Sequence, residues 1–248
     1  MKKHKPADSI QDIQYFGEYG GVNPSIADSS TFTYLAGKTM EMVFGGEREG
    51  CYLYSRHMNP STGYLAEAIS NMENTDAAHV SASGMGAISS AIMELCKSGD
   101  HIVSSRTIYG GSYAFMKNFL PKLKISTSFV DITNLDSVKS AICVDTKILY
   151  CETMSNPLLE ISDIKKLAKL AHKNNLKLVV DNTFTPLIFS PAELGADIVI
   201  HSLTKFINGA SDTVGGVICS TKEFVGDLID VNKGAAMLLG PTMDAIRA

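Results

Sequence analysis

Short apolar segments alternate with amphipathic segments over most of this chain, from Gly63 to about residue 220. The amphipathic segments have the length of ordinary helices, about 10–15 residues, and the apolar segments have the length of buried strands. Such alternation predicts right-handed crossovers and an α/β fold, with a mostly parallel sheet covered by helices on both faces. The predicted strands lie at residues 77–83, 101–105, 125–130, 147–153, 177–181, 197–202 and 215–220.

Several of the predicted helices have recognisable ends. Thr133 followed by Asp136 has the pattern of a capping box for a helix that ends near Cys143. Ser162 is the predicted N-cap of the next helix. Pro121 is expected to end a helix over residues 112–120, because proline cannot continue the hydrogen-bond ladder.

The first part of the chain lacks this regularity. Residues 15–63 are rich in Gly, Asn, Ser, Pro and aromatic residues, and they show neither the helix period nor the strand period. We therefore expect residues 1–62 to form an irregular N-terminal arm that contacts a neighbouring subunit, and residues 63–248 to form the α/β domain.

Charge and cysteine content narrow the classes of function. The chain has 22 Lys and Arg against 26 Asp and Glu, a net charge of -4 without blocks of like charge, which argues against nucleic acid or a membrane surface as partner. The basic start is not followed by the apolar stretch of a signal peptide. The cysteines form no Cys-x-x-Cys pair, and no histidine lies at a metal-ligand spacing from them. These features predict a soluble, cytoplasmic protein with reduced thiols and no metal.

Ligands of parallel α/β sheets bind beyond the carboxyl ends of the strands. In this chain the residues at those positions are polar and rich in glycine, so we expect a ligand site at this edge of the sheet. The segments are residues 83–86, 109–112, 152–157, 181–183 and 201–205.

The first of these segments contains Gly84-Met85-Gly86, between a predicted strand and a predicted helix. Free backbone N–H groups and the helix dipole at such a turn suit a phosphate, although a tight turn also selects small residues for steric reasons alone. A dinucleotide site would need a third glycine and an acid at the end of the next strand. The chain instead has Ser89 at the third position and Asp100 before its strand, so the dinucleotide interpretation is weak.

Asp181 and Lys205 suggest a more specific ligand. Asp181 ends a Val-rich strand, where a buried carboxylate must find a partner; this can be the protonated ring nitrogen of a cofactor or, in a purely structural role, a helix cap or turn. Lys205 follows Ser202 and Thr204, whose hydroxyls could bind phosphate oxygens, although a lone lysine after a strand is usually only solvated. Together these groups meet the needs of pyridoxal 5′-phosphate: an amine for its aldehyde, hydroxyls for its phosphate, an acid for its ring nitrogen, and Tyr109 as a flat partner for its ring.

Longer motifs in the same order resemble a known family. The segment Asp181-Asn182-Thr183-Phe184, followed by residues 201–212 (HSLTKFINGASD), looks like the signature of the Cys/Met-metabolism family of pyridoxal-phosphate enzymes. Residues 54–60 (YSRHMNP), 83–85 (SGM) and 109–111 (YGG) resemble further motifs of that family. The family includes cystathionine γ-synthase, cystathionine γ-lyase, methionine γ-lyase and O-acetylhomoserine sulfhydrylase. The resemblance implies the large domain of a fold-type I pyridoxal-phosphate enzyme.

The resemblance implies roles for the residues around the cofactor ring. Lys205 is expected to form the Schiff base with pyridoxal 5′-phosphate and to shuttle the α-proton of the substrate. Tyr109 is expected to stack on the ring and to act as a second catalytic residue. Asp181 is expected to pair with the ring nitrogen, and Asn156 to hydrogen-bond the ring hydroxyl.

The resemblance also implies which residues hold the cofactor phosphate. Within the chain they are Gly84, Met85, Ser202 and Thr204. Tyr54 and Arg56 match residues that reach the phosphate of a neighbouring subunit. The site is therefore expected to be shared across a homodimer or homotetramer.

The chain departs from the family in four respects. Methionine γ-lyases often carry Cys two residues after the stacking Tyr, whereas this chain has Gly111, which fits synthase or cystathionine-lyase relatives better. Ala210 stands where many relatives have His, and Met154 where many have Pro. Relatives also continue into a small C-terminal domain that carries the arginine for the substrate carboxylate, and Arg247 lies too early to match it. We therefore expect the chain to be a fragment or truncated product without that domain.

Three functions follow as hypotheses. The first is pyridoxal-phosphate-dependent γ-elimination or γ-replacement on sulfur amino acids or O-acyl-homoserine, by a lyase or transferase of transsulfuration, methionine and cysteine metabolism. The second is a truncated remnant that binds the cofactor without catalysis. The third, a nucleotide-binding α/β module, depends only on the glycine turn. The sequence does not separate elimination from replacement or identify the substrate.

Overall fold

The computed structural model describes residues 4–11, 20–45, 47, 50–231 and 233–238. Its centre is a seven-stranded sheet in the order β1-β7-β6-β5-β4-β2-β3. The mostly parallel α/β sheet predicted from the alternation is confirmed, and the largest difference is that β1 ends two residues before the predicted position. In chain order the strands are β1 (Ala77–Ser81), β2 (His101–Ser105), β3 (Ser126–Val130), β4 (Thr146–Glu152), β5 (Lys177–Asp181), β6 (Ile198–Ser202) and β7 (Gly216–Ser220).

One strand runs against the others. β7 pairs antiparallel with both β6 and β1, whereas the pairs from β6 across to β3 are parallel. Consequently β1 to β6 all present their carboxyl ends at one edge, and β7 begins at that edge. Gly216, the first residue of β7, is in register with both Ser81 and Ser202. The register therefore brings three chain segments together where the ligand site was expected.

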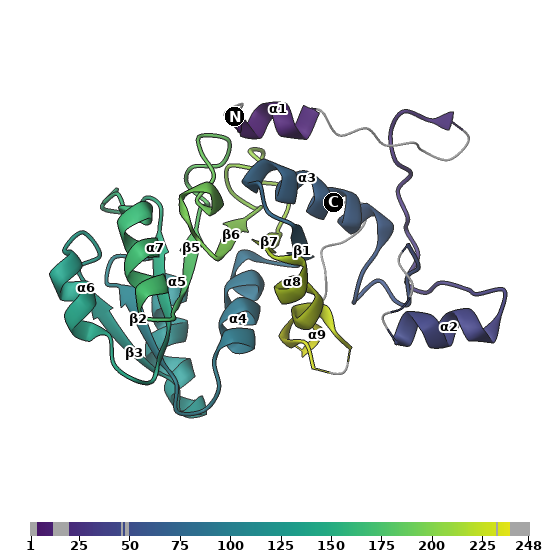
Figure 1. The fold of residues 1–248 in the computed structure, drawn as a ribbon. Helices are drawn as coiled ribbons and strands as arrows, with labels where there is room; N and C mark the ends of the chain where they lie inside the picture. The colour runs from purple at the N-terminus through teal and green to yellow at the C-terminus, as the bar shows by residue number, and fades with distance from the viewer. Residues whose placement is uncertain (1–3, 12–19, 46, 48–49, 232, 239–248) are drawn as a thin grey trace.

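Helices cover both faces of the sheet (Figure 1). One face packs against α4 and α8, and the other against α3, α6 and α7. The described helices are α1 (Pro6–Gln11), α2 (Gly37–Phe44), α3 (Pro60–Glu73), α4 (Gly84–Leu95), α5 (Gly110–Ala114), α6 (Leu135–Ala141), α7 (Ile164–Lys173), α8 (Lys222–Ile229) and α9 (Ala235–Leu238).

The strand residues alternate between two apolar layers. Val179, Ile200 and Ile218 belong to the layer under α4, and Val180 and Val199 belong to the opposite layer. All five side chains are fully buried. Burial on both faces explains why the strands read as nearly continuous apolar runs in the sequence.

Two of the predicted helix caps are wrong. The N-cap of α6 is Asn134, whose side chain accepts from two backbone N–H groups, whereas Thr133 hydrogen-bonds to Asp131. The N-cap of α7 is Asp163, because the Ser162 hydroxyl donates to a carbonyl of β4 instead. Adjacent polar side chains compete for these positions, and tertiary contacts decide between them.

The predicted helix over residues 112–120 also differs. α5 is followed directly by a π-helical turn at Phe115–Phe119 and a 3₁₀ turn at Leu120–Leu123. The second turn contains Pro121 at one of its first two positions, where the missing N–H of proline is tolerated. Pro121 therefore begins a new turn instead of ending the helical segment.

The segment predicted to be an arm lies mostly outside the packed layers. In Figure 1 the chain around α2 projects away from the sheet, while α1 lies against α3. Large apolar side chains of this segment are exposed, including Val22 at 86% and Leu35 at 110%. It is less irregular than predicted, because α2 forms within it. Arg247 lies outside the described residues.

Candidate functional site

A pocket of about 840 Å³ lies at the carboxyl edge of the sheet. It brings together eight of the residues singled out in the sequence: Gly84, Met85, Tyr109, Asn156, Asp181, Ser202, Thr204 and Lys205. They come from five separate segments, each following a different strand. The pocket is also lined by Ser83, Ile88, Glu152, Met154, Thr183, Phe184, Phe206, Gly209, Ser211 and Val214.

The glycine turn forms one wall of this pocket. Ser83 caps α4 by accepting from the backbone N–H of Gly86 at 2.9 Å. A Cβ on Gly84 would lie 2.7 Å from the Cβ of Ser202, so only glycine allows these two segments to come this close. The amino end of α4 and the Ser202 hydroxyl thus lie side by side, an arrangement that suits an anion.

Asp181 lies at the floor of the pocket, at the end of β5. Its side chain is buried, and its Oδ1 accepts from the backbone N–H of Thr183 at 3.0 Å. Burial raises the pKa of Asp181, and hydrogen bonds from Thr183 and the nearby His201 oppose that shift. A cation placed beside this carboxylate would keep it ionised.

Thr183 was not assigned a role from the sequence, but it joins the two strand ends. Its hydroxyl accepts from the backbone N–H of Ser202 at 2.8 Å, while its own N–H donates to Asp181. Thr204 is held in turn by Gly215, whose N–H donates to its hydroxyl at 3.1 Å. Lys205 follows these fixed residues, and its side chain is exposed at the pocket. Within the described ranges no carboxylate forms an ion pair with it.

The Tyr109 ring lies against a glycine and lines the pocket. A Cβ on Gly111 would come 2.5 Å from the Tyr109 ring and 3.1 Å from the sulfur of Met85. Tyr109 as a whole residue is 47% exposed and it lines the pocket, so it is accessible to a ligand there. A side chain at position 111 would collide with the Tyr109 ring, so the ring can lie here only because residue 111 is glycine.

Glu152 is the main pocket residue that the sequence analysis left without a role. It is only 5% exposed, and its two oxygens accept from the backbone N–H groups of Tyr109, at 2.6 Å, and Asn156, at 3.1 Å. Burial, and then the charge of Asp181, raise the pKa of Glu152 to about 7. The available signal was an acid at the end of a buried strand, the same feature that singled out Asp181.

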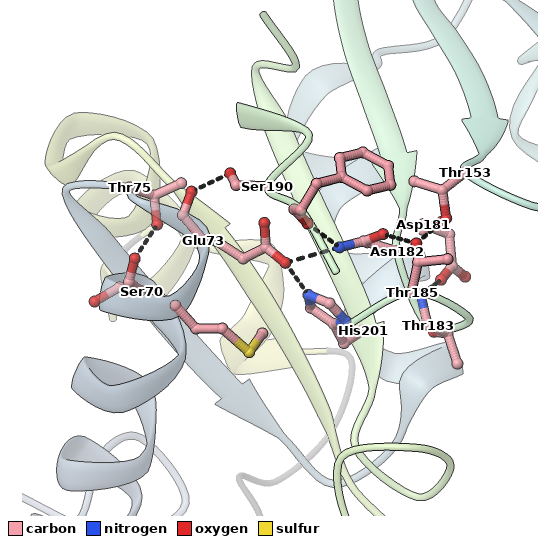
Figure 2. Close-up of polar contacts among 12 residues, drawn as sticks. Ser70, Glu73, Thr75, Thr153, Asp181, Asn182, Thr183, Thr185, Ser190 and His201 are labelled. Carbon is pink, nitrogen blue, oxygen red and sulfur yellow. Dashed lines mark hydrogen bonds and ion pairs between the residues drawn. The ribbon is translucent and has the colours of Figure 1, made fainter. Parts of the chain in front are cut away.

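A further buried carboxylate, that of Glu73, lies outside the pocket and contacts two of the strand ends that form it. Figure 2 shows Glu73, at the end of α3, reaching both Asn182 and His201. Its Oε1 accepts from Asn182 Nδ2 at 2.9 Å and lies 2.6 Å from His201 Nε2. Asn182 follows Asp181, and His201 precedes Ser202, so one carboxylate holds the ends of β5 and β6 in place.

Tyr54 and Arg56 lie apart from this pocket. They are not among its lining residues, and the Arg56 guanidinium lies 5.5 Å from the centre of the Tyr54 ring. Their predicted contact with a neighbouring subunit stays a prediction, as do the individual roles of the pocket residues.

The described residues contain neither a membrane-spanning helix nor a cluster of metal ligands. Over the ranges that the structure describes, no helix is long and apolar enough to cross a membrane. No group of three or more His, Cys, Asp or Glu side chains in those ranges could hold a metal. The cysteines are free, and burial raises the pKa of Cys96 and Cys151 to about 12, as expected for structural thiols.

Comparison with known proteins shows the family of the chain. Residues 9–248 match the family model described as Cys/Met metabolism PLP-dependent enzyme. A methionine gamma-lyase of Arabidopsis thaliana is 46% identical over 97% of this chain and 56% of its own length. A cystathionine gamma-lyase of Bacillus subtilis is 43% identical over 82% of this chain and 54% of its own length.

A solved structure has the same fold. It is a putative O-acetylhomoserine (thiol)-lyase from Campylobacter jejuni, described with N′-pyridoxyl-lysine-5′-monophosphate, and it is superimposable with a TM-score of 0.84. It is 28% identical, over 90% of this chain and 54% of that one. The chain thus spans about half the length of the relatives it matches. By its family match and its sequence identity to these lyases, the chain belongs to the pyridoxal-phosphate-dependent enzymes of Cys/Met metabolism.

Proposed function

We propose that the chain is the cofactor-binding part of an enzyme that carries out γ-elimination or γ-replacement on sulfur amino acids or O-acyl-homoserine. The observation that carries this proposal is the convergence of Lys205, Asp181 and the Gly84 turn on one pocket. The family to which the chain belongs depends on pyridoxal phosphate. The glycine turn would then bind the phosphate of pyridoxal phosphate. It was the only feature that favoured a nucleotide-binding module, so that hypothesis loses its support.

The pocket residues fit the cofactor in charge and shape. The close approach of Gly84 to Ser202 leaves backbone N–H groups and a hydroxyl together for a phosphate. Asp181 offers a buried carboxylate to a protonated ring nitrogen, and the accessible Tyr109 offers a stacking surface. Lys205 supplies the amine that attachment to an aldehyde requires.

Pyridoxal phosphate, when bound, acts as an electron sink for negative charge that develops at the α-carbon of an amino acid. In this chain, Lys205 Nζ would hold the cofactor and, once released by the substrate amine, would take the α-proton. Asp181 would keep the ring nitrogen protonated. Tyr109 would hold the ring by stacking on its face, and Asn156 would hold it by a hydrogen bond to its hydroxyl group. A further proton must leave the β-carbon before the γ-substituent can depart with the electron pair of its bond. Lys205 Nζ could accept this proton only after it has passed the α-proton on and is neutral again.

Covalent attachment to Lys205 is the direct test. The purified chain would be mixed with pyridoxal phosphate, reduced with borohydride and digested, and the labelled peptide would be identified by mass spectrometry. We expect the label on Lys205, and no fixed label in Lys205→Ala. Lys177→Ala, which removes a lysine remote from the pocket, serves as the control. A label on another lysine, or no binding by the folded chain, would contradict the proposal.

A second candidate is a chain that binds the cofactor but does not turn over substrate. The observation that favours it is the composition of the pocket, because none of the described lining residues is an arginine that could clamp a substrate carboxylate. Assays with cystathionine, methionine and O-acetylhomoserine distinguish the two candidates. Turnover by the 248-residue chain would exclude the second, and cofactor attachment without turnover would support it.

The arm suggests how copies of the chain associate. We propose a cytoplasmic homodimer or homotetramer in which the arm lies on a second copy, because Val22, Ile26 and Leu35 expose apolar surface that water does not favour. In such an assembly Tyr54 and Arg56 would reach the neighbouring pocket. Light scattering after gel filtration should show at least a dimer, which removal of residues 20–45 should convert to a monomer.

A further inference from the structure

Glu152 places one buried carboxylate between two segments that flank the pocket. Its Oε1 accepts from Tyr109 N and its Oε2 from Asn156 N. Tyr109 precedes α5, and Asn156 lies in the loop after β4, so each oxygen holds a different segment. These are also the segments that carry the proposed ring-stacking and ring-hydroxyl residues.

Glu152 itself is firmly held. Its carbonyl accepts from the Ser162 hydroxyl at 2.6 Å, and its backbone is in register with Asp181 on the neighbouring strand. A side chain that projects from a central strand is placed more accurately than one on a loop. Both flanking segments therefore take their position from β4.

The chemistry of the two contacts requires a carboxylate. Each donor is a backbone N–H, and the two donors meet opposite oxygens of the same side chain. A carboxylate accepts at both oxygens, whereas a carboxamide accepts at one and presents N–H groups at the other. Glutamine at position 152 would leave one of the two backbone donors facing another donor.

We propose that Glu152 is a positioning residue, which sets the separation between the Tyr109 ring and the Asn156 side chain and thereby fixes the orientation of the cofactor ring between them. This inference rests on the proposed function, because it assumes that the pocket binds pyridoxal phosphate. Glu152 acts through two backbone N–H groups, and its carboxylate is committed to them.

The first part of the test uses the cofactor-free chain and NMR. Because the pKa of Glu152 is raised to about 7, the amide proton resonances of Tyr109 and Asn156 should shift together with a midpoint near pH 7. Thr183 N donates to Asp181, so its resonance reports the titration of that neighbouring carboxylate separately. The common shift should disappear in Glu152→Gln.

The other titratable groups around Glu152 are distinguishable from it. Tyr150 and Cys151 precede it on β4, and burial raises the pKa of both, for Cys151 to about 12. Lys205 and the Tyr109 phenol share the pocket with it. Glu160→Gln makes the same chemical change at a partly exposed position of the same loop and serves as the matched control, which should retain the common shift.

The second part of the test measures the bound cofactor. Loss of one hydrogen bond to a charged group should weaken pyridoxal phosphate binding by about tenfold or more in Glu152→Gln. The visible circular dichroism of the bound cofactor, which reports its orientation, should change in this variant and not in Glu160→Gln. If Glu152→Gln does not fold, the wild-type chain decides, because its cofactor dichroism must then change with the same pH midpoint as the Tyr109 and Asn156 amide resonances recorded on the cofactor-bound chain.

The outcomes separate this inference from the proposed function. Normal cofactor binding by the wild-type chain, with equal affinity and dichroism in Glu152→Gln and Glu160→Gln, would overturn the positioning role alone. Amide resonances of Tyr109 and Asn156 that do not titrate together would overturn it as well. Failure of the wild-type chain to bind pyridoxal phosphate would overturn the proposed function, and the positioning role with it.

Discussion

Replacement of Glu73 by alanine should lower the free energy of unfolding more than the same replacement at any other glutamate of the described helices. Glu73 is 1% exposed, and it is the acceptor for Asn182 and a partner of His201, which are both fully buried (Figure 2). Alanine would leave His201 Nε2 without this partner and Asn182 Nδ2 with only the longer contact to the carbonyl of Phe189, at 3.4 Å. A buried polar group that loses its hydrogen-bond partner costs about 1–3 kcal/mol.

We therefore expect Glu73→Ala to lower the free energy of unfolding by about 3 kcal/mol, the upper part of the range for an unpaired buried polar group. For a chain of this size each kcal/mol corresponds to about 2–4 °C in Tm, so the expected loss is about 6–12 °C. Urea and thermal unfolding, followed by circular dichroism, measure both quantities. Glu73→Gln keeps one acceptor oxygen in the same place and should lose less than half as much.

Glu67→Ala is the matched control. Glu67 lies on the exposed side of the same helix, and its removal should change the unfolding free energy by no more than about 0.5 kcal/mol. If Glu73→Ala and Glu67→Ala were equally stable, the buried network would contribute nothing, and the physical reasoning about these contacts would be refuted.

Two further predictions concern pH and packing. Burial, and then the charge of His57, lower the pKa of His79 from 6.5 to about 4, so its contribution to stability is complete above pH 6.5 and is lost as the pH falls toward 4. That shift corresponds to about 3 kcal/mol, and His79→Val should remove this part of the pH dependence of urea unfolding; an unchanged profile would contradict it. A Cβ on Gly216 would lie 2.1 Å from the carbonyl oxygen of Ser83, so Gly216→Ala should displace the glycine turn, lower the unfolding free energy by about 1–3 kcal/mol and weaken pyridoxal phosphate binding. Gly226→Ala, with open space around that position in α8, should be neutral or slightly stabilising, and equal behaviour of the two variants would count against the packing argument.

The strands could be predicted from the sequence because each one is marked by its own consecutive residues. Burial on both faces makes each strand a run of apolar residues, and the observed strands have almost the same bounds as these runs. The direction of β7 could not be predicted, because residues 216–220 have the same pattern whichever way the strand runs. The caps of α6 and α7 failed for a similar reason: several adjacent side chains can cap a helix, and a distant partner decides which one does. The Ser162 hydroxyl, for example, donates to the carbonyl of Glu152 and does not cap α7.

The supporting carboxylates were missed because their partners are remote in the sequence. Glu152 and Tyr109 are 43 residues apart, and Glu73 and His201 are 128 apart. A motif displays the residues that face a ligand, because these cluster at strand ends. It does not display Glu73, which holds two strand ends from α3. Glu152 does lie at a strand end, and there only its partners, the N–H groups of Tyr109 and Asn156, could not be identified from the sequence.

The two acids at the ends of β4 and β5 show how the pocket distinguishes ligands by charge. Glu152 and Asp181 are in register on adjacent strands, and burial raises the pKa of each. Hydrogen bonds oppose this rise: two backbone N–H groups donate to Glu152, and both the backbone and the side chain of Thr183 donate to Asp181, yet both pKa values stay above normal. A ligand that carries positive charge to Asp181 relieves its repulsion with Glu152, so the pocket floor favours a protonated ring nitrogen over a neutral one.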